Sequence, residues 1–140
     1  MQPDGGRKRI VIAEDDASIR ELIFLRLELA GYLAVGTRNG VEAMREMEMR
    51  RPHGLVLDLG MPELDGFGVL EQMSQRHLAV PTLVLTARHC AGDVEKAVKL
   101  GAVDYLAKPF DDKDFLRRVE RMVRGGMPCS APSSPHQILI

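Results

Sequence analysis

The chain has almost no net charge, few cysteines and no long apolar run, and each shortage excludes a class of protein. Nineteen basic and twenty acidic side chains leave a formal net charge of −1 over 140 residues, so the overall balance does not attract nucleic acid or anionic lipid. No stretch approaches the roughly 18–20 apolar residues that cross a bilayer. The polar start from Met1 to Arg9 has no signal-peptide core. We therefore expect no membrane segment and no secretion signal.

The two cysteines, Cys90 and Cys129, stand far apart without metal-type spacing. Isolated thiols are typical of the reducing cytoplasm, where disulfides are rare. A chain of 140 residues fits one domain with its own core. His53 and His77 have no partner that the sequence identifies, so we expect both on the surface or in loops. The sequence thus predicts a cytoplasmic protein with one domain.

Short apolar runs alternate with stretches of helical periodicity. The apolar runs predict strands at residues 9–13, 33–37, 55–59, 82–86 and 103–106. The periodic stretches predict helices that end near Gly31, Arg50, Arg76, Leu100 and Gly125. Asn39 and Asp65 are suited to cap the second and third helices. Five strands alternating with five helices predict an α/β fold with a parallel sheet.

The composition divides the chain into three parts. Residues 1–8 are expected to form an N-terminal tail, and residues 9–124 the folded domain. Residues 125–140 are rich in glycine, proline and serine, which predicts a flexible linker or tail. The apolar end at Ile138–Ile140 is abrupt for a solvated tail, so we expect an output domain to follow in a longer protein.

Polar side chains collect where the predicted strands end, and ligands bind there in open α/β sheets. These side chains are Glu14, Asp15, Asp16, Asp58, Thr86 and Lys108. Carboxylate oxygens are the ligands that Mg²⁺ prefers, while an ammonium and a hydroxyl can bind a phosphoryl group. Clustered carboxylates raise one another's pKa unless a cation balances their charge. The set predicts a phosphoryl site with Mg²⁺, for which Mn²⁺ is the alternative ion.

Each of these residues alone has an ordinary structural explanation. The acids after the first strand suit the N-terminus of a helix, where the helix dipole favours negative charge. Thr86 and Lys108 are common residue types at strand ends and in loops. Asp58 is harder to explain in this way, because it follows the apolar run Leu55–Leu57, where an unpaired charge is costly. The joint arrangement therefore favours a functional site.

Four segments carry a resemblance to a known family. They are residues 10–15 (IVIAED), 57–66 (LDLGMPELDG), 84–87 (VLTA) and 105–110 (YLAKPF). In this order and spacing they resemble the receiver domains of two-component response regulators, the CheY-like family, over about residues 9–124. The resemblance implies a flavodoxin-like (βα)5 fold. This is a three-layer sandwich whose five-stranded parallel sheet has the order 2-1-3-4-5, with helices on both faces.

The resemblance also implies the roles of the acids. Asp58 corresponds to the aspartate that the family phosphorylates. Asp15 and Asp58 correspond to direct Mg²⁺ ligands, together with the backbone carbonyl of Gly60. Glu14 corresponds to the outer acid that holds metal-bound water. Asp16 remains as a third acid, suited to capping the first helix.

Further roles follow at the last two strands. Lys108 corresponds to the lysine that pairs with phosphoryl oxygens, and Thr86 to the hydroxyl that bonds to them after the switch. Ala87 is small, as the family prefers, and offers a backbone N–H to the phosphoryl group. Tyr105 corresponds to the aromatic residue that changes rotamer on activation. The peptide between Lys108 and Pro109 is expected to be cis.

The resemblance implies a signalling switch that catalyses only its own phosphorylation and dephosphorylation. The donor is a phosphohistidine on a sensor histidine kinase or a phosphotransfer protein. The output, through a joined domain or a separate effector, follows a conformational shift near the fourth helix and fifth strand. The alternative is a Mg²⁺-dependent phosphatase or phosphotransferase with an aspartyl nucleophile, but such enzymes place that nucleophile after the first strand. A flavin-binding flavodoxin would need a phosphate-cradling loop after the first strand, and the chain has acids there.

The last predicted helix carries a basic stripe of Arg117, Arg118, Arg121 and Arg124. A solvated helix face explains such a stripe, since cations favour a helix C-terminus. The alternative is a partner surface or a homodimer through the fourth helix, fifth strand and fifth helix. The resemblance implies such a dimer, because relatives with DNA-binding outputs pair acids like Asp104 with cations like Arg118 there. No aromatic residues interleave with the stripe, so direct nucleic-acid binding is not expected.

Overall fold

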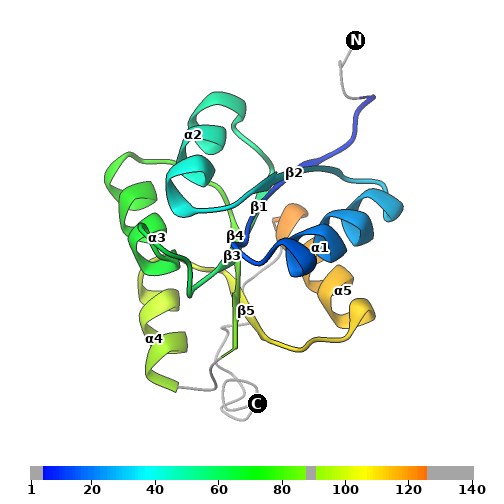
Figure 1. The fold of residues 1–140 in the computed structure, drawn as a ribbon. Coiled ribbons are helices and arrows are strands. Elements are labelled where there is room, and N and C mark those ends of the chain that lie inside the picture. The colour runs from blue at the N-terminus through cyan, green and yellow to red at the C-terminus, as the bar shows by residue number, and fades with distance from the viewer. Residues whose placement is uncertain (1–4, 88–90, 126–140) are drawn as a thin grey trace.

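The computed structural model of the chain describes residues 5–87 and 91–125. Five parallel strands form one sheet in the order β2-β1-β3-β4-β5, which confirms the predicted order (Figure 1). The strands are β1 (Arg9–Ala13), β2 (Leu33–Thr37), β3 (Gly54–Asp58), β4 (Thr82–Thr86) and β5 (Asp104–Ala107). β3 and β5 are each displaced by one residue from the predicted ranges, because an apolar run identifies buried residues but not where pairing with a neighbour begins.

Five helices cover the sheet in two outer layers. They are α1 (Ala17–Leu29), α2 (Gly40–Arg50), α3 (Gly66–Gln75), α4 (Ala91–Lys99) and α5 (Asp112–Val123). Figure 1 shows α1 and α5 on one face of the sheet and α2, α3 and α4 on the other. The three-layer α/β sandwich that the sequence predicts is therefore confirmed.

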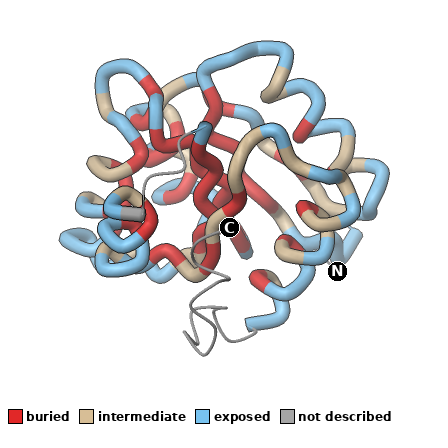
Figure 2. The backbone as a smooth tube through the Cα atoms, turned by 90° about the horizontal axis from the view of Figure 1, so that it is seen from below, coloured by how far each residue is buried: buried red, intermediate tan, exposed pale blue. Residues whose placement is uncertain are grey.

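Alternate residues of the strands pack into two separate cores. Ile10 and Ile12 of β1 face a core with α1 and α5, while Val11 and Ala13 face a core with α2, α3 and α4. Strands covered on both faces read as continuous apolar runs, and β3 and β4 are buried at every position. Figure 2 shows the buried strands inside and the exposed outer sides of the helices.

The N-termini of three helices are fixed by side-chain caps. Asp16 accepts hydrogen bonds from the backbone N–H groups of Ser18 and Ile19, and the predicted caps Asn39 and Asp65 each accept one from the first turn of α2 and α3. Such a bond satisfies a backbone donor that has no partner within the helix. Each cap therefore fixes where its helix begins beside the carboxyl ends of the strands.

Several smaller predictions concern the histidines, the cis peptide and the segments outside the described residues. His53 and His77 are exposed and lie outside the helices and strands, as expected. His53 Nδ1 also accepts a hydrogen bond of 3.0 Å from the backbone N–H of Arg9, a partner that the sequence did not identify. The peptide between Lys108 and Pro109 is cis, as expected. Both cysteines and the predicted linker from residue 126 onward lie outside the described residues. Among the described helices, none has the length and apolar character needed to cross a membrane.

Candidate functional site

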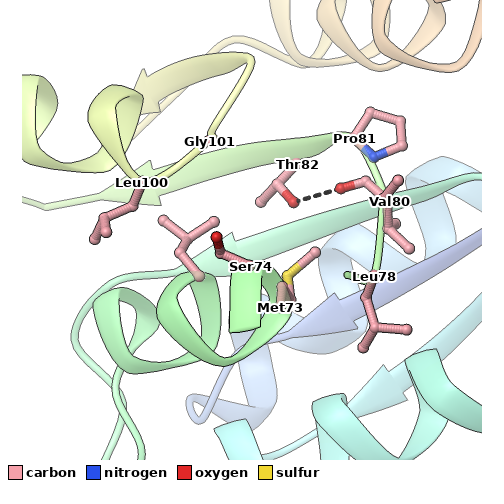
Figure 3. Close-up of a pocket in the computed structure, with 10 residues that line it drawn as sticks. Met73, Ser74, Leu78, Val80, Pro81, Thr82, Leu100 and Gly101 are labelled. Atoms are coloured by element: carbon pink, nitrogen blue, oxygen red, sulfur yellow. Dashed lines mark hydrogen bonds between the residues drawn. The ribbon is translucent and has the colours of Figure 1, made fainter. Parts of the chain in front are cut away.

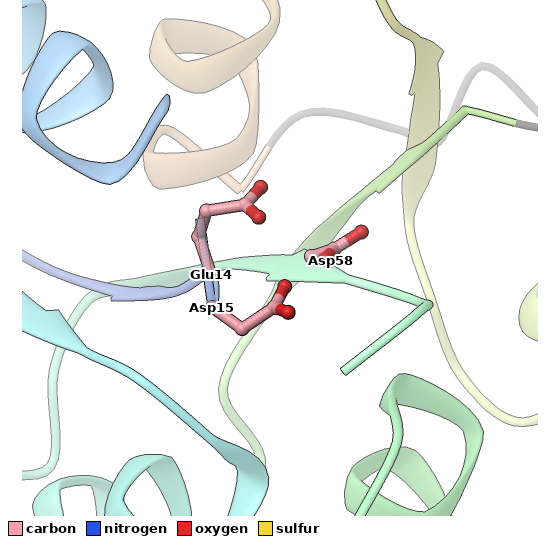
Figure 4. Close-up of side chains that lie close together, drawn as sticks. All are labelled: Glu14, Asp15 and Asp58. Atoms are coloured by element: carbon pink, nitrogen blue, oxygen red, sulfur yellow. The ribbon is translucent and has the colours of Figure 1, made fainter. Parts of the chain in front are cut away.

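Three carboxylates meet where β1 and β3 end. Glu14 and Asp15 follow β1 directly, and Asp58 is the last residue of β3. The two strands are neighbours, with Ala13 paired to Leu57. One oxygen from each carboxylate lies within 4.8 Å of the others, and Figure 4 shows the three groups around a common space. The structure thus brings together the acids that the sequence singles out.

Lys108 follows β5 at the same end of the sheet and contacts two of these acids. Its Nζ lies 2.7 Å from Glu14 Oε1 and 3.3 Å from Asp58 Oδ1. Glu14 is 1% exposed and Asp58 6% exposed, whereas Asp15 is exposed. Removing one member of a buried ion pair leaves an uncompensated charge. Glu14, Asp58 and Lys108 therefore stabilise one another.

Burial and neighbouring charges shift the pKa values of Glu14 and Lys108. Burial raises the pKa of Glu14 from 4.5 to about 7; the hydrogen bond from Lys108 opposes this rise, and the charge of Asp58 adds to it. Burial alone would lower the pKa of Lys108, but its contacts with Glu14 and Asp58 outweigh that effect and the pKa is raised. The ammonium therefore stays charged near neutral pH, while Glu14 lies close to its own titration point.

The donor set suits a hard divalent cation. When all groups are ionised, three carboxylates and the Lys108 ammonium leave two negative charges in excess, which one divalent ion balances. All the side-chain donors are carboxylate oxygens. Mg²⁺ and Mn²⁺ prefer such oxygen ligands, whereas softer metals prefer sulfur or nitrogen ligands. The backbone N–H of Gly60 donates to Asp58 Oδ1 at 3.3 Å, so the loop after β3 also reaches the site.

The ends of β4 and β5 complete this edge of the sheet. Asp58 pairs with Leu85 in the ladder, which places Thr86 one residue beyond that partner. The backbone N–H of Lys108 donates to the carbonyl of Thr86 at 2.8 Å, so the two strand ends are joined. Thr86 is 2% exposed, while the next residue, Ala87, is exposed.

Tyr105 lies on β5, three residues before Lys108. Its ring is half-buried and packs against the core beneath α2, α3 and α4. Its backbone N–H donates to Asp104 at 2.8 Å, and its carbonyl accepts from Arg118 at 3.3 Å. Tyr105 therefore connects the strand beside Lys108 to the surface of α5.

The basic stripe on α5 is paired within the chain. Arg118 lies 2.6 Å from Asp104 and 3.2 Å from Asp114, and Asp114 also pairs with Arg117. Asp104 is only 7% exposed. The pairing of Asp104 with Arg118 that we considered for a homodimer thus exists within one molecule.

Arg20 is a site residue that the sequence analysis missed. Its Nη1 donates to the carbonyl of Glu14 at 2.9 Å and lies 3.4 Å from that of Asp15. The available signal is its place in the first turn of α1, four residues after the cap Asp16. A long side chain at that position can reach back to the loop between β1 and α1.

A separate cavity of about 400 Å³ lies near the start of β4, at the end of the sheet opposite to the carboxylates (Figure 3). It is lined by α3, the start of β4 and residues after α4, and none of its lining residues is ionisable. The hydroxyl of Thr82 donates within it to the carbonyl of Val80 at 3.0 Å. Because it lacks charged groups, this cavity cannot provide the chemistry of the carboxylate site.

Comparison with known proteins agrees with this geometry. The response regulator receiver domain family matches residues 10–120. The chain belongs to this family. Receiver domains are the phospho-accepting signalling switches of two-component systems and are generally Mg²⁺-dependent.

Relatives of this receiver domain are regulators of about twice its length. The alkaline phosphatase synthesis transcriptional regulatory protein PhoP of Bacillus subtilis (strain 168) is 37% identical over 127 residues, covering 91% of this chain and 52% of that protein. The response regulator MprA of Mycobacterium sp. (strain KMS) is also 37% identical over 127 residues, covering 91% and 55%. The receiver domain therefore spans about half the length of these relatives.

Solved structures share the fold. The Francisella response regulator 1452 receiver domain has a TM-score of 0.81 at 26% identity, covering 85% of this chain and 98% of that one. The signal receiver domain of a signal transduction histidine kinase from Syntrophus aciditrophicus has a TM-score of 0.77 at 32% identity, covering 84% and 91%. The same receiver fold thus occurs both in a response regulator and within a histidine kinase.

Proposed function

We propose that Asp58 accepts a phosphoryl group from a phosphohistidine on a sensor histidine kinase or phosphotransfer protein, in a Mg²⁺-dependent reaction. One observation carries the proposal: the Asp58 carboxylate ends a buried strand with Lys108 Nζ 3.3 Å away and two further carboxylates in reach. A nucleophile, a fixed cation and ligands for a metal are the parts that phosphoryl transfer needs.

Each side chain has a distinct role in this proposal. Asp15, Asp58 and the backbone carbonyl of Gly60 would hold the ion, and Glu14 would bind one of its water ligands. The ion supplies neutralisation of charge on the phosphoryl oxygens. Lys108 supplies a second positive charge on the same oxygens and keeps its own charge, because its pKa is raised.

The transfer step exchanges one bond for another. A carboxylate oxygen of Asp58 forms a bond to phosphorus as the phosphorus–nitrogen bond to the donor histidine breaks, leaving the imidazole and an aspartyl phosphate. The transition state is loose, so positioning and charge neutralisation account for most of the catalysis. Water later attacks the same phosphorus as the bond between phosphorus and the Asp58 oxygen breaks, which releases inorganic phosphate and regenerates the carboxylate. The domain in this way catalyses only its own phosphorylation and dephosphorylation.

The test uses acetyl phosphate as a small donor. We expect wild-type protein in Mg²⁺ to gain one phosphoryl group by intact mass, and Asp58→Asn to gain none while melting at the same or a higher temperature. Asp65→Asn is the matched control, because it lies in the loop after β3 and keeps a capping oxygen. An undiminished adduct on Asp58→Asn would refute the assignment, and continuous release of phosphate without an adduct would favour the phosphatase alternative.

We further propose that Thr86 and Tyr105 transmit phosphorylation to α4, β5 and α5. Thr86 lies buried beside Asp58 at the end of β4, so its hydroxyl can donate to a phosphoryl oxygen. A bond of this charge-assisted kind contributes roughly 1.5–3 kcal/mol, enough to shift a balanced two-state equilibrium about tenfold or more. Movement of Thr86 would leave space beside β5, into which the half-buried Tyr105 ring turns.

This coupling can be measured by NMR of the Tyr105 ring with and without beryllofluoride, a phosphoryl mimic. We expect a full ring shift in wild type and in Thr86→Ser, which keeps the hydroxyl. Thr86→Ala should still bind the mimic but lose the shift. A full ring shift in Thr86→Ala would show that the signal leaves the site by another route.

The proposal extends to the partners of the domain. An output domain joined through residues 125–140, or a separate effector, would read the altered face, as the double length of the relatives suggests. A homodimer through α4, β5 and α5 is one form of that output. The sparse and isolated cysteines support a cytoplasmic location.

A further inference from the structure

Arg20 contacts the loop that carries two of the three carboxylates. The residue is half-buried in the first turn of α1, where its backbone N–H donates to the carbonyl of Asp16 at 2.9 Å. Its side chain turns back, so that Nη1 donates to the carbonyl of Glu14 at 2.9 Å and lies 3.4 Å from that of Asp15. One guanidinium group therefore reaches two consecutive peptide units of this loop.

The direction of those carbonyls determines where the carboxylates point. Rotation of the peptide unit between Glu14 and Asp15 moves both side chains relative to Asp58. The loop has two other ties, from the N–H of Glu14 to the carbonyl of Thr37 at 3.1 Å and from the N–H of Asp16 to Glu14 Oε2 at 3.2 Å. These two bonds use the N–H groups of the peptides before and after the one between Glu14 and Asp15. Arg20, through the carbonyl of Glu14, restrains the peptide between Glu14 and Asp15 itself.

β2 provides the path for the Arg20 side chain. Gly36 is exposed, and a Cβ atom placed on it would lie 3.5 Å from Arg20 Cδ and 3.6 Å from Arg20 Cγ. A methyl group at position 36 would make an ordinary contact, whereas a branched side chain would occupy the space of the arginine stem. Gly36 therefore allows Arg20 to lie over β2 and reach the loop.

We propose that Arg20 is a positioning residue for the metal site, which holds the peptide between Glu14 and Asp15 so that both carboxylates face Asp58. This inference rests on the proposed function. The positive charge of Arg20 by itself opposes the binding of a cation, while the restraint on the loop favours it. The two contributions have opposite signs, and variants that separate charge from hydrogen bonding distinguish them.

The first experiment measures the Mg²⁺ dissociation constant by titration followed with ¹H–¹⁵N NMR. Residues that orient metal ligands typically change affinity by tenfold or more when they are removed. We expect about tenfold weaker Mg²⁺ binding in Arg20→Met, which keeps the stem, and weaker binding in Arg20→Lys, which keeps the charge but lacks the forked guanidinium. Melting in chelator should stay close to wild type for both. Equal or tighter Mg²⁺ binding by Arg20→Met would overturn the proposal.

The second experiment leaves Arg20 in place and blocks its path. Gly36→Val should weaken Mg²⁺ binding, as Arg20→Met does, whereas Gly36→Ala should bind Mg²⁺ like wild type. The double variant Gly36→Val with Arg20→Met should bind Mg²⁺ no more weakly than Arg20→Met alone. Full additivity would overturn the proposal. Wild-type protein that binds no Mg²⁺ would refute the proposed function as well, whereas normal wild-type binding with unaffected Arg20 variants would refute the positioning role alone.

Discussion

Glu14 is almost fully buried, yet it lies among two other carboxylates and a lysine. Its pKa near 7 differs from the 4.5 expected for an exposed glutamate, so the proton is held more tightly in the folded state than in the unfolded one. Between these two values the folded chain carries a proton that the unfolded chain has released. The stability of the metal-free protein must therefore change with pH in this window.

We predict that the free energy of unfolding falls as pH rises from about 5 to 7 when a chelator is present. The stabilising contribution is complete below pH 4.5 and is lost as pH rises through the folded pKa of about 7. The total loss is on the order of 3 kcal/mol, since one pKa unit corresponds to about 1.4 kcal/mol. Urea unfolding at stepped pH values measures it.

Glu14→Gln is the matched control for this prediction. Glutamine has nearly the same shape and does not titrate, so the fall between pH 5 and 7 should be smaller in the variant by the contribution of Glu14. Parallel curves for wild type and Glu14→Gln would show that Glu14 does not hold its proton as described.

Two glycines near the end of β3, Gly60 in the loop that follows it and Gly66 at the start of α3, have opposite surroundings. A Cβ atom on Gly66 would lie 2.7 Å from the Cα of Leu59 and 2.8 Å from the carbonyl oxygen of Asp58, whereas a Cβ atom on Gly60 would meet nothing within 4 Å. The N–H of Gly66 also donates to the carbonyl of Leu59 at 3.1 Å. The start of α3 thus packs directly against the backbone of the proposed acceptor.

We predict that Gly66→Ala lowers the free energy of unfolding by about 2 kcal/mol or more, because backbone must move to relieve the contact. It should also slow phosphorylation of Asp58 by acetyl phosphate, as the acceptor carbonyl shifts. Gly60→Ala should change stability by less than about 0.5 kcal/mol. Chemical denaturation of both variants tests this, and equal stability of the two would contradict the close approach at Gly66.

Local sequence patterns predict the helices and strands well, because helix caps and apolar runs involve residues that are close together in the sequence. Asn39 and Asp65 are recognisable as caps, and the apolar runs identify all five strands to within one residue. The carboxylate site also follows from sequence, since parallel strands bring Asp15 and Asp58 to one edge. Arg20 and His53 were not predicted as contacts, because each bonds to backbone atoms, and any residue type supplies those.

At the scale of the whole molecule, the proposed metal site links charge and stability. The nearly neutral chain concentrates three acids in one place, where their repulsion opposes folding when no cation is bound. An ion that binds only the folded state stabilises it by about 2.7 kcal/mol at a concentration one hundred times its dissociation constant.

We therefore predict that millimolar Mg²⁺ raises the melting temperature of wild-type protein relative to chelator. Asp15→Ala should remove most of this rise, because it deletes an exposed ligand of the site without disturbing the buried pair of Glu14 and Lys108. Asp111→Ala is a suitable control, since Asp111 is also exposed and its side chain makes no cap bond to α5. Calorimetry in both buffers measures the shift, and identical melting of wild-type protein in Mg²⁺ and chelator would contradict the metal site.

The ion pair between Asp104 and Arg118 within one molecule has a consequence for assembly. When two molecules associate through this face, Asp104 of each could pair with Arg118 of the other. Two such ion pairs exist before association and two exist after it. The exchange is neutral in the number of ion pairs, so it sets the register between the subunits without driving their association. Shape and apolar contact would have to supply the affinity, and a dimer of this kind would respond only weakly to added salt.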